Sequence, residues 1–184
     1  HLIYEEGTAL YKLMEAGKVT PIEEDLSVTL FSTLINRLTE AGYLHYEISN
    51  FAKAGDKSRH NLVYWHYNPY LAFGAGATRF DGRTRENNPA YLAAYERGEA
   101  PEIECLSPAV QREEMIFMNL RTVRGLSLLD YEARFGRSFA FDYGPQIENL
   151  IHKGWAKWED GHFCLTPLGM QYGNLAFEAF ITTD

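Results

Sequence analysis

Leucines recur every fourth residue in the first quarter of the chain, at positions 26, 30, 34 and 38, with mostly polar residues between them. This spacing is the period of an amphipathic helix. Acidic residues occupy positions 23–25, where they favour a helix start, and Gly42 follows the last leucine as a typical stop signal. The pattern therefore predicts a helix between Pro21 and Gly42.

The next segments have a different pattern. The sequence "YLHYEISNFA" (43–52) is rich in β-branched and aromatic residues and too short for a good helix, so it predicts a buried strand. A loop, "KAGDKSRHN" (53–61), follows. The sequence "YLAFGAGATRF" (70–80) predicts a second strand, interrupted by Gly74 and Gly76. A helix followed by strands indicates an α/β region over residues 1–80.

The rest of the chain predicts helices and one hairpin. A turn at Asp81-Gly82 opens a polar connector with a short helix, over residues 81–106. Further helices are expected over 109–123, from the N-cap Ser127 to 136, over 144–154 and over 167–181. Between the last two, "WAKWEDGHFCLT" contains an Asp-Gly pair between aromatic residues, which is typical of a hairpin. We therefore expect a winged-helix-like α+β domain over 107–184.

Composition narrows the classes of function. The net charge is −8, whereas nucleic-acid binding depends on clustered Lys and Arg, and the helix that would read DNA offers only His152 and Lys153. We expect no nucleic-acid partner. No apolar run is long enough for a membrane span, and no signal peptide opens the chain. Cys105 and Cys164 are isolated, which favours two small buried side chains and a reducing, cytoplasmic compartment.

The start of the chain carries one further expectation. The sequence begins without Met, and "HLIYEEGTAL" is typical of a strand end that runs into a loop. We therefore expect an excerpt from a longer protein.

A histidine surrounded by aromatic residues is the first candidate site. In "SRHNLVYWHY", His60 could ligate a metal such as haem iron, and Tyr64 and Trp65 could line a porphyrin face. His66 could act similarly, with less support. The alternative is that His60 only forms hydrogen bonds in a loop.

A carboxylate and two glycines form the second candidate. Glu47 lies inside an apolar segment, where a buried carboxylate must be paired or face a polar cavity. It could bind a cofactor or form a structural ion pair. Gly74 and Gly76 permit a close backbone approach, either to a ligand or to a neighbouring segment.

Several segments together resemble one family. They are "EEGTALYKL", "GYLHYEISNFAKAG", "SRHNLVYW", "YLAFGAGA", "MNLRTVRGLSLLDYEARFG" and "LIHKGWAKWEDGHFCLTPLGMQYGN". They resemble the later part of the radical-SAM proteins long labelled oxygen-independent coproporphyrinogen III oxidase, specifically the HemW-type branch regarded as haem chaperones. The resemblance covers essentially the whole chain.

The resemblance implies an α/β fold: the C-terminal fragment of a partial (β/α) barrel, followed by the winged-helix-like domain. Family members bind a 4Fe-4S cluster through a C-x-x-x-C-x-x-C loop, and S-adenosylmethionine (SAM) fills the remaining iron site. Those cysteines do not occur in this chain. We expect the chain alone to be inactive in radical chemistry, with cluster and SAM bound by the full-length protein.

The resemblance also assigns candidate residues. Its haem-linked motif falls on His60, Asn61, Tyr64 and Trp65, with His60 as the axial iron ligand. Its SAM pocket would be bordered by Glu47, Gly74, Gly76, Ala77 and Thr78. Relatives commonly read Gly-Ala-His-Ser where this chain has Gly-Ala-Thr-Arg at 76–79. This departure puts the assignment at Thr78 in doubt.

Three hypotheses about function follow. The first is a haem chaperone that delivers haem to a target protein, and the second is an oxidase that decarboxylates coproporphyrinogen III to protoporphyrinogen IX. The third is a domain that only covers the barrel or docks a partner, through Trp155, Trp158 and Phe163. Association of the parent protein with a membrane surface is compatible with the first hypothesis.

Overall fold

The computed structural model of the chain describes residues 4–181. The chain divides into two compact units, residues 1–44 and 45–184. The strand end expected at the start of the chain falls partly on residues 1–3, which lie outside the described residues.

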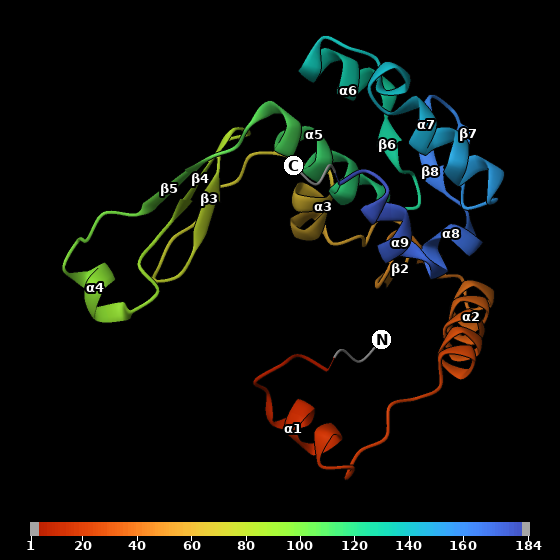
Figure 1. The fold of residues 1–184 in the computed structure, drawn as a ribbon, viewed down its shortest axis with the longest axis horizontal. Coiled ribbons are helices and arrows are strands. Elements are labelled where there is room, and N and C mark those ends of the chain that lie inside the picture. Colours follow the sequence, from red (N-terminus) through yellow and green to blue (C-terminus); the bar gives the residue numbers. More distant parts are fainter. Residues whose placement is uncertain (1–3, 182–184) are drawn as a thin grey trace. The chain divides into compact units, whose positions relative to one another are not determined.

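The first unit contains two helices, α1 (Ala9–Glu15) and α2 (Glu24–Glu40) (Figure 1). The predicted leucine helix is confirmed as α2, and Gly42 follows it with φ +78°. Helix α1 was not predicted. It begins after Thr8, whose hydroxyl oxygen accepts a hydrogen bond from the backbone N–H of Tyr11 at 3.2 Å. The sequence signals for α1 were the capping residue Thr8 before it and Gly17, with φ +67°, just after it.

The single strand predicted over 43–52 is wrong. Two short strands, β1 (Leu44–His45) and β2 (Phe51–Ala52), pair with each other instead. The residues between them pair with a distant segment: the backbone N–H of Ile48 donates to the carbonyl of Arg121 at 2.9 Å, and that of Val123 donates to the carbonyl of Tyr46 at 3.1 Å. This non-local pairing explains why an extended pattern did not produce one continuous strand.

The loop predicted before the histidine motif is also partly wrong, because helix α3 (Arg59–Trp65) contains the motif. Ser58 begins the helix, and its hydroxyl oxygen accepts from the backbone N–H of Asn61 at 3.3 Å. The helix ends just before Tyr67, a non-glycine residue with φ +55°. The N-cap residue was a local signal that the sequence analysis did not use.

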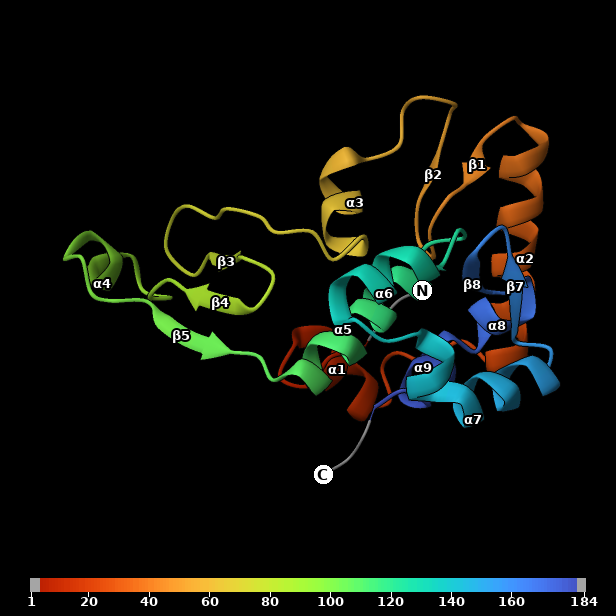
Figure 2. The ribbon, with the colours of Figure 1, turned by 90° about the horizontal axis from the view of Figure 1, so that it is seen from above.

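Residues 70–105 form an extension that we call the arm. Strands β3 (Thr78–Phe80), β4 (Thr84–Asn87) and β5 (Glu102–Cys105) make an antiparallel sheet in that order. Figure 2 shows the arm with α4 (Leu92–Glu96) at its far end. The Asp81-Gly82 turn is confirmed, since a carboxylate oxygen of Asp81 accepts two backbone N–H groups at 2.8 Å. The strand predicted over 70–80 is reduced to β3 and a bridge between Tyr70 and Phe80.

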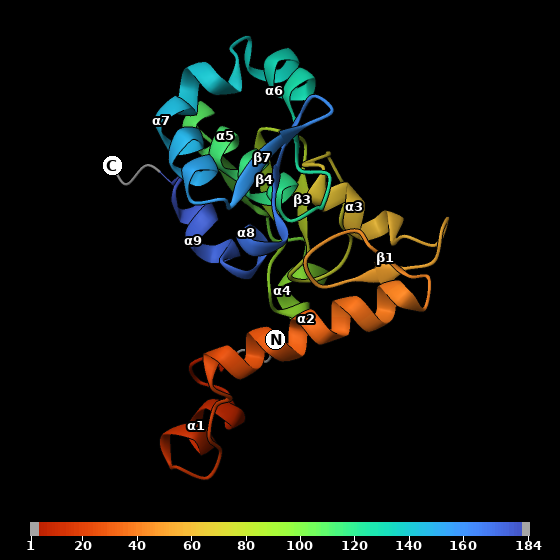
Figure 3. The same ribbon diagram turned by 90° about the vertical axis from the view of Figure 1, so that its right-hand side faces the viewer.

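The remaining elements surround the main hydrophobic core. They are α5 (Pro108–Leu120), β6 (Leu126–Ser127), α6 (Leu128–Phe135), α7 (Phe139–His152), β7 (Ala156–Glu159), β8 (His162–Leu165), α8 (Pro167–Gln171) and α9 (Gly173–Glu178). The strands form a sheet ordered β6-β8-β7, which contacts α5, α7 and α8, and Figure 3 shows α7 beside β7. The core includes Ile116, Leu120, Tyr131, Phe139, Phe163 and Phe180, each at most 1% exposed.

Most predictions for this region are confirmed. Ser127 caps α6, and the hairpin turns at Asp160 and Gly161, which have φ +45° and +74°. The predicted last helix is two helices, α8 and α9, because the helical conformation is interrupted at Tyr172. Helix α7 starts earlier than expected, at Phe139, with non-helical backbone at Tyr143. No helix within residues 4–181 has the length and hydrophobicity needed to cross a membrane.

The predicted division into 1–80, 81–106 and 107–184 stays a prediction. Strands on both sides of residue 80 pair in the arm.

Candidate cofactor-binding site

Helix α3 presents His60 to solvent. The imidazole lies edge-on to the ring of Tyr64, with 5.0 Å between centroids, and Tyr64 in turn contacts the ring of Tyr70 at 4.6 Å. Within residues 4–181, neither ring nitrogen of His60 has a hydrogen-bond partner. The alternative in which His60 ties a loop together by hydrogen bonds is therefore wrong. An exposed imidazole with free nitrogens beside an aromatic face has the donor chemistry that haem iron requires.

The four motif residues do not share one surface. At about 100° per residue along a helix, Trp65 lies about 140° around the axis from His60. His60 and Tyr64 share one face, and Asn61 and Trp65 share another. Trp65 lies beside Arg121, which follows α5, with the guanidinium 4.5 Å from its ring centroid. The four motif residues are thus divided between two faces of α3, and the imidazole of His60 shares its face with Tyr64.

Glu47 is fully buried. One carboxylate oxygen accepts from the backbone N–H of Ser49 at 3.1 Å, and its backbone bridges Thr122. The other oxygen has no hydrogen-bond partner among the described residues. No ion pair joins Glu47 to Arg121 in residues 4–181. The two charges still influence each other, because burial lowers the pKa of Arg121 and the negative charge of Glu47 opposes that shift. The predicted structural ion pair is therefore absent among the described residues, and the predicted cofactor contact stays a prediction.

The glycine loop is held from within the arm. The N–H of Gly74 donates to the hydroxyl of Tyr95 at 3.2 Å, and the N–H of Gly76 donates to the carbonyl of Pro89 at 2.9 Å. The side-chain amide of Asn88 donates to the carbonyl of Gly74 at 2.9 Å. Both glycines have positive φ, +104° and +70°, which a side chain would strain. The N–H groups of both glycines are therefore already used within the arm.

Ala77 and Thr78 complete the predicted border. The N–H of Ala77 donates to the carbonyl of Gly74 at 3.3 Å, and the hydroxyl of Thr78 donates to the side-chain oxygen of Asn87 at 2.7 Å. The glycine loop is therefore held by hydrogen bonds within the arm, whereas Glu47 is held by Ser49 and Thr122. The two parts of the predicted SAM border, Glu47 and residues 74–78, are thus fixed by different contacts.

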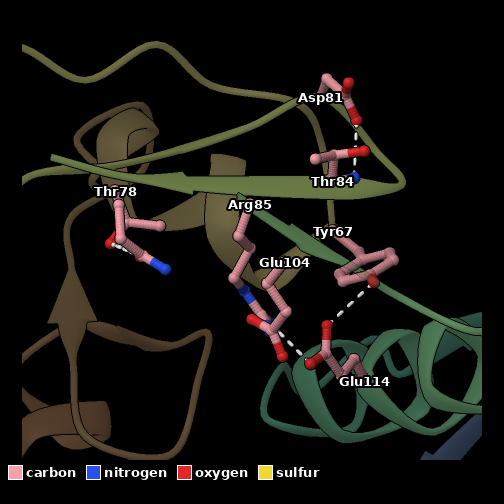
Figure 4. A network of polar contacts seen from close by, with 8 residues as sticks. Tyr67, Thr78, Asp81, Thr84, Arg85, Glu104 and Glu114 are labelled. Atoms are coloured by element: carbon pink, nitrogen blue, oxygen red, sulfur yellow. Dashed lines mark hydrogen bonds and ion pairs between the residues drawn. The ribbon is translucent and has the colours of Figure 1, made fainter. Parts of the chain in front are cut away.

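A polar network joins the end of the motif to the arm (Figure 4). The carboxylate of Glu114 accepts from the hydroxyl of Tyr67 at 2.9 Å and from the guanidinium of Arg85 at 2.6 Å. Arg85 also reaches Glu104 at 3.3 Å. Burial, together with Glu114, raises the pKa of Tyr67. Sequence analysis missed this network, because its members lie far apart in the chain and no local pattern relates them.

The described residues contain no group of side chains that could bind an iron-sulfur cluster or another metal centre with three or more ligands. Within residues 4–181, no group of three or more His, Cys, Asp or Glu side chains could hold a metal ion. Cys164 is buried, as expected, and burial raises the pKa of its thiol. Cys105 is exposed on β5, so the expectation that it is buried is wrong. The described residues therefore offer no set of cluster ligands, whereas the exposed imidazole of His60 has the donor chemistry of a haem-iron ligand.

Comparison with known proteins identifies the family. Residues 106–172 match the HemN C-terminal domain family. The chain is 32% identical over 187 residues to heme chaperone HemW of Lactococcus lactis, covering 100% of this chain and 49% of the relative. It is 32% identical over 186 residues to heme chaperone HemW of Bacillus subtilis, with 98% and 49% covered. It is also 37% identical over 171 residues to the mouse mitochondrial radical S-adenosyl methionine domain-containing protein 1, with 83% and 38% covered.

A solved structure has a similar fold. It is coproporphyrinogen III oxidase (HemN) from Escherichia coli, described as a radical SAM enzyme, and the match covers 82% of this chain and 40% of that chain. The TM-score is 0.61 at 17% sequence identity, which is evidence about the fold alone.

Residues 106–172 thus match the HemN C-terminal domain family, which gives the class of this part of the chain. The chain as a whole is similar to the bacterial proteins named heme chaperone HemW. The family resemblance and the expected fold class are confirmed. The chain spans about half the length of the bacterial relatives named above.

Proposed function

We propose that this chain is part of a radical-SAM haem chaperone, which binds haem and delivers it to target proteins. Two bacterial relatives that match nearly its whole length are named heme chaperones. The observation that carries the proposal is the exposed imidazole of His60, whose ring nitrogens are free within the described residues and which lies beside Tyr64.

In this proposal the imidazole of His60 would hold the haem iron through a ring nitrogen, whose lone pair is available when the ring is neutral. The ring of Tyr64, which lies 5.0 Å from the imidazole between centroids, would line the porphyrin. Asn61 and Trp65 lie on the other face of α3, where Trp65 contacts Arg121.

Glu47, Gly74, Gly76, Ala77 and Thr78 border the SAM pocket of the whole protein in this proposal. Because the N–H groups of Gly74, Gly76 and Ala77 are engaged within the arm, the loop would contact SAM through its remaining backbone atoms and Cβ atoms. Bound in the whole protein, SAM and the 4Fe-4S cluster would supply control over haem loading or transfer.

The oxidase hypothesis has less support. The likeness to the Escherichia coli oxidase is at 17% identity and concerns the fold, so it does not favour oxidase chemistry. Of the three residues named for a docking role, Trp158 is about half exposed, Trp155 stacks on Tyr172, and Phe163 belongs to the buried core.

Haem titration of the whole protein tests the proposal. We expect His60→Ala to lose the Soret shift that the wild type gives. The matched control is His152→Ala, an exposed histidine of the last turn of α7, which should bind haem as the wild type does. Equal Soret shifts for wild type and His60→Ala would contradict the assignment. Formation of protoporphyrinogen IX from coproporphyrinogen III would support the oxidase instead.

Three further proposals concern the setting of the protein. We propose a cytoplasmic location and a haem-receiving protein partner. We also propose that the protein has no nucleic-acid partner, because its net charge is −8. Association with a membrane surface would bring haem close to membrane-bound acceptors. Binding of the whole protein to vesicles in a flotation assay tests this association.

A further inference from the structure

The short helix α3 depends on side-chain contacts for its orientation. It has seven residues, none of them fully buried, and a helix this short is marginal on its own. Any contact that fixes its rotation therefore fixes the direction of His60. The contacts of Tyr64 secure one side of the helix. Trp65 is the contact on the other side.

Arg121 meets Trp65 from the HemN C-terminal domain. It is the C-cap residue that directly follows α5. Its guanidinium lies 4.5 Å from the ring centroid of Trp65 and 5.6 Å from that of Phe117. Phe117 packs edge-on against Phe177 of α9 at 4.9 Å. A continuous series of contacts therefore connects the motif helix to the core of the domain.

The charge on Arg121 is retained at a cost. Among the described residues it has no ion pair, and its Nε atom is buried without a hydrogen-bond partner. The side-chain atoms in this situation within residues 4–181 also include Nε1 of Trp65 and Oε1 of Glu47. Such groups are rare in folded proteins and need an explanation. An apolar side chain would pack beside Trp65 without this cost, so packing alone does not explain an arginine here.

Arg121 also holds the segment that contains Glu47. Its carbonyl accepts the backbone N–H of Ile48 at 2.9 Å. One residue thus contacts both predicted binding segments, Trp65 through its side chain and Ile48 through its main chain.

We infer that Arg121 is a positioning residue of the proposed haem site, which fixes the rotation of α3 through its cation–π contact with Trp65 and so directs the imidazole of His60. This inference rests on the proposed function. The role requires the positive charge over the indole face, and the apolar part of the side chain alone does not fulfil it.

Haem titration of whole-protein variants tests the inference. Loss of one such cation–π contact corresponds to a change in affinity of about tenfold. We expect Arg121→Gln to bind haem about tenfold more weakly and to change the Soret spectrum of the complex, because the iron ligation by His60 is altered. Arg121→Lys, which keeps a charge over the ring, should recover most of the affinity and the spectrum.

A packing control separates positioning from stability. Phe117→Leu trims the packing beside Arg121 and keeps both Arg121 and Trp65. We expect it to lower the melting temperature and to leave the Soret spectrum unchanged. A spectral change as large as that of Arg121→Gln would overturn the inference, as would Arg121→Gln binding with wild-type affinity and spectrum.

The outcome also distinguishes this inference from the proposed function. If the wild type and His60→Ala bind haem equally, the proposed function fails. If binding depends on His60 but Arg121→Gln behaves as the wild type, only the positioning role fails.

Discussion

The arm and the HemN C-terminal domain are held together by different forces. The domain buries aromatic and aliphatic side chains, with Phe139, Phe163 and Phe180 at most 1% exposed. The arm leaves apolar side chains at the surface, with Phe73 85% and Tyr91 82% exposed. Its base is joined to α5 by the carboxylate of Glu114. The domain is thus stabilised mainly by the hydrophobic effect, whereas at the base of the arm charge and hydrogen bonds add to the packing of Phe80 on Tyr67.

The largest effect is expected in the core of the domain. Phe163→Ala removes a fully buried ring that contacts Phe139 and Trp158, and we expect it to lower the free energy of unfolding by about 4 kcal/mol. Denaturant unfolding followed by circular dichroism measures this loss. Leu129→Ala, at a position 76% exposed, should cost about 0.5 kcal/mol. Similar losses for the two variants would contradict the comparison.

A smaller and local effect is expected at the base of the arm. Glu114→Gln removes the charge that faces Arg85 across 2.6 Å, with both side chains about one quarter exposed or less. We expect a loss of about 2 kcal/mol, seen as faster hydrogen exchange of backbone amides in β4 and β5. Amides of β7 and β8 should exchange as in the wild type.

The matched control for that variant is Glu86→Gln. It breaks the pair of Arg79 and Glu86, whose side chains are 44% and 32% exposed. Such a surface pair contributes about 0.5 kcal/mol, so exchange in the arm should change little. An equal effect of both variants would show that the network at Glu114 has no special role.

The smallest effect is a pH dependence at Tyr67. Burial, then Glu114, raises its pKa above the ordinary 10.0. Below pH 10 the phenol is protonated in both states and its contribution is constant. Above pH 10 the unfolded state loses the proton first, so stability falls by up to about 1.4 kcal/mol per pH unit.

Tyr67→Phe removes this contribution. Urea unfolding between pH 9 and 11 should therefore show a shallower decline for the variant than for the wild type. Tyr131 and Tyr143 also have raised pKa values, mainly because they are buried, so the difference between the two curves is the quantity to compare. Parallel curves would contradict the assignment to Tyr67.

Local signals predicted those elements that local interactions determine. The leucine spacing gave α2, Ser127 gave α6, and Asp160-Gly161 gave the hairpin. The strand expected over 43–52 failed because residues 46–48 pair with residues 121–123. Strand β4, "TREN", is polar and gains its conformation from its neighbours in the arm.

The candidate site was likewise predictable only where local sequence features identify a residue. Residue type alone pointed to His60 and Glu47. Arg121 and Glu114 could not be recognised, because their roles arise from contacts with Trp65, Tyr67 and Arg85 that only the folded chain creates. The split of the motif between two faces of α3 depended on recognising a helix where a loop was expected.

The stacking of Arg121 on Trp65 has a practical consequence. The chain has three tryptophans, and they lie in unlike surroundings: Trp65 under a guanidinium, Trp155 parallel to Tyr172 at 4.9 Å, and Trp158 about half exposed on the hairpin. Single-tryptophan versions would therefore emit at distinct wavelengths. During a haem titration, the fluorescence of Trp65 would then report on α3, and that of Trp158 would report separately on the hairpin of β7 and β8.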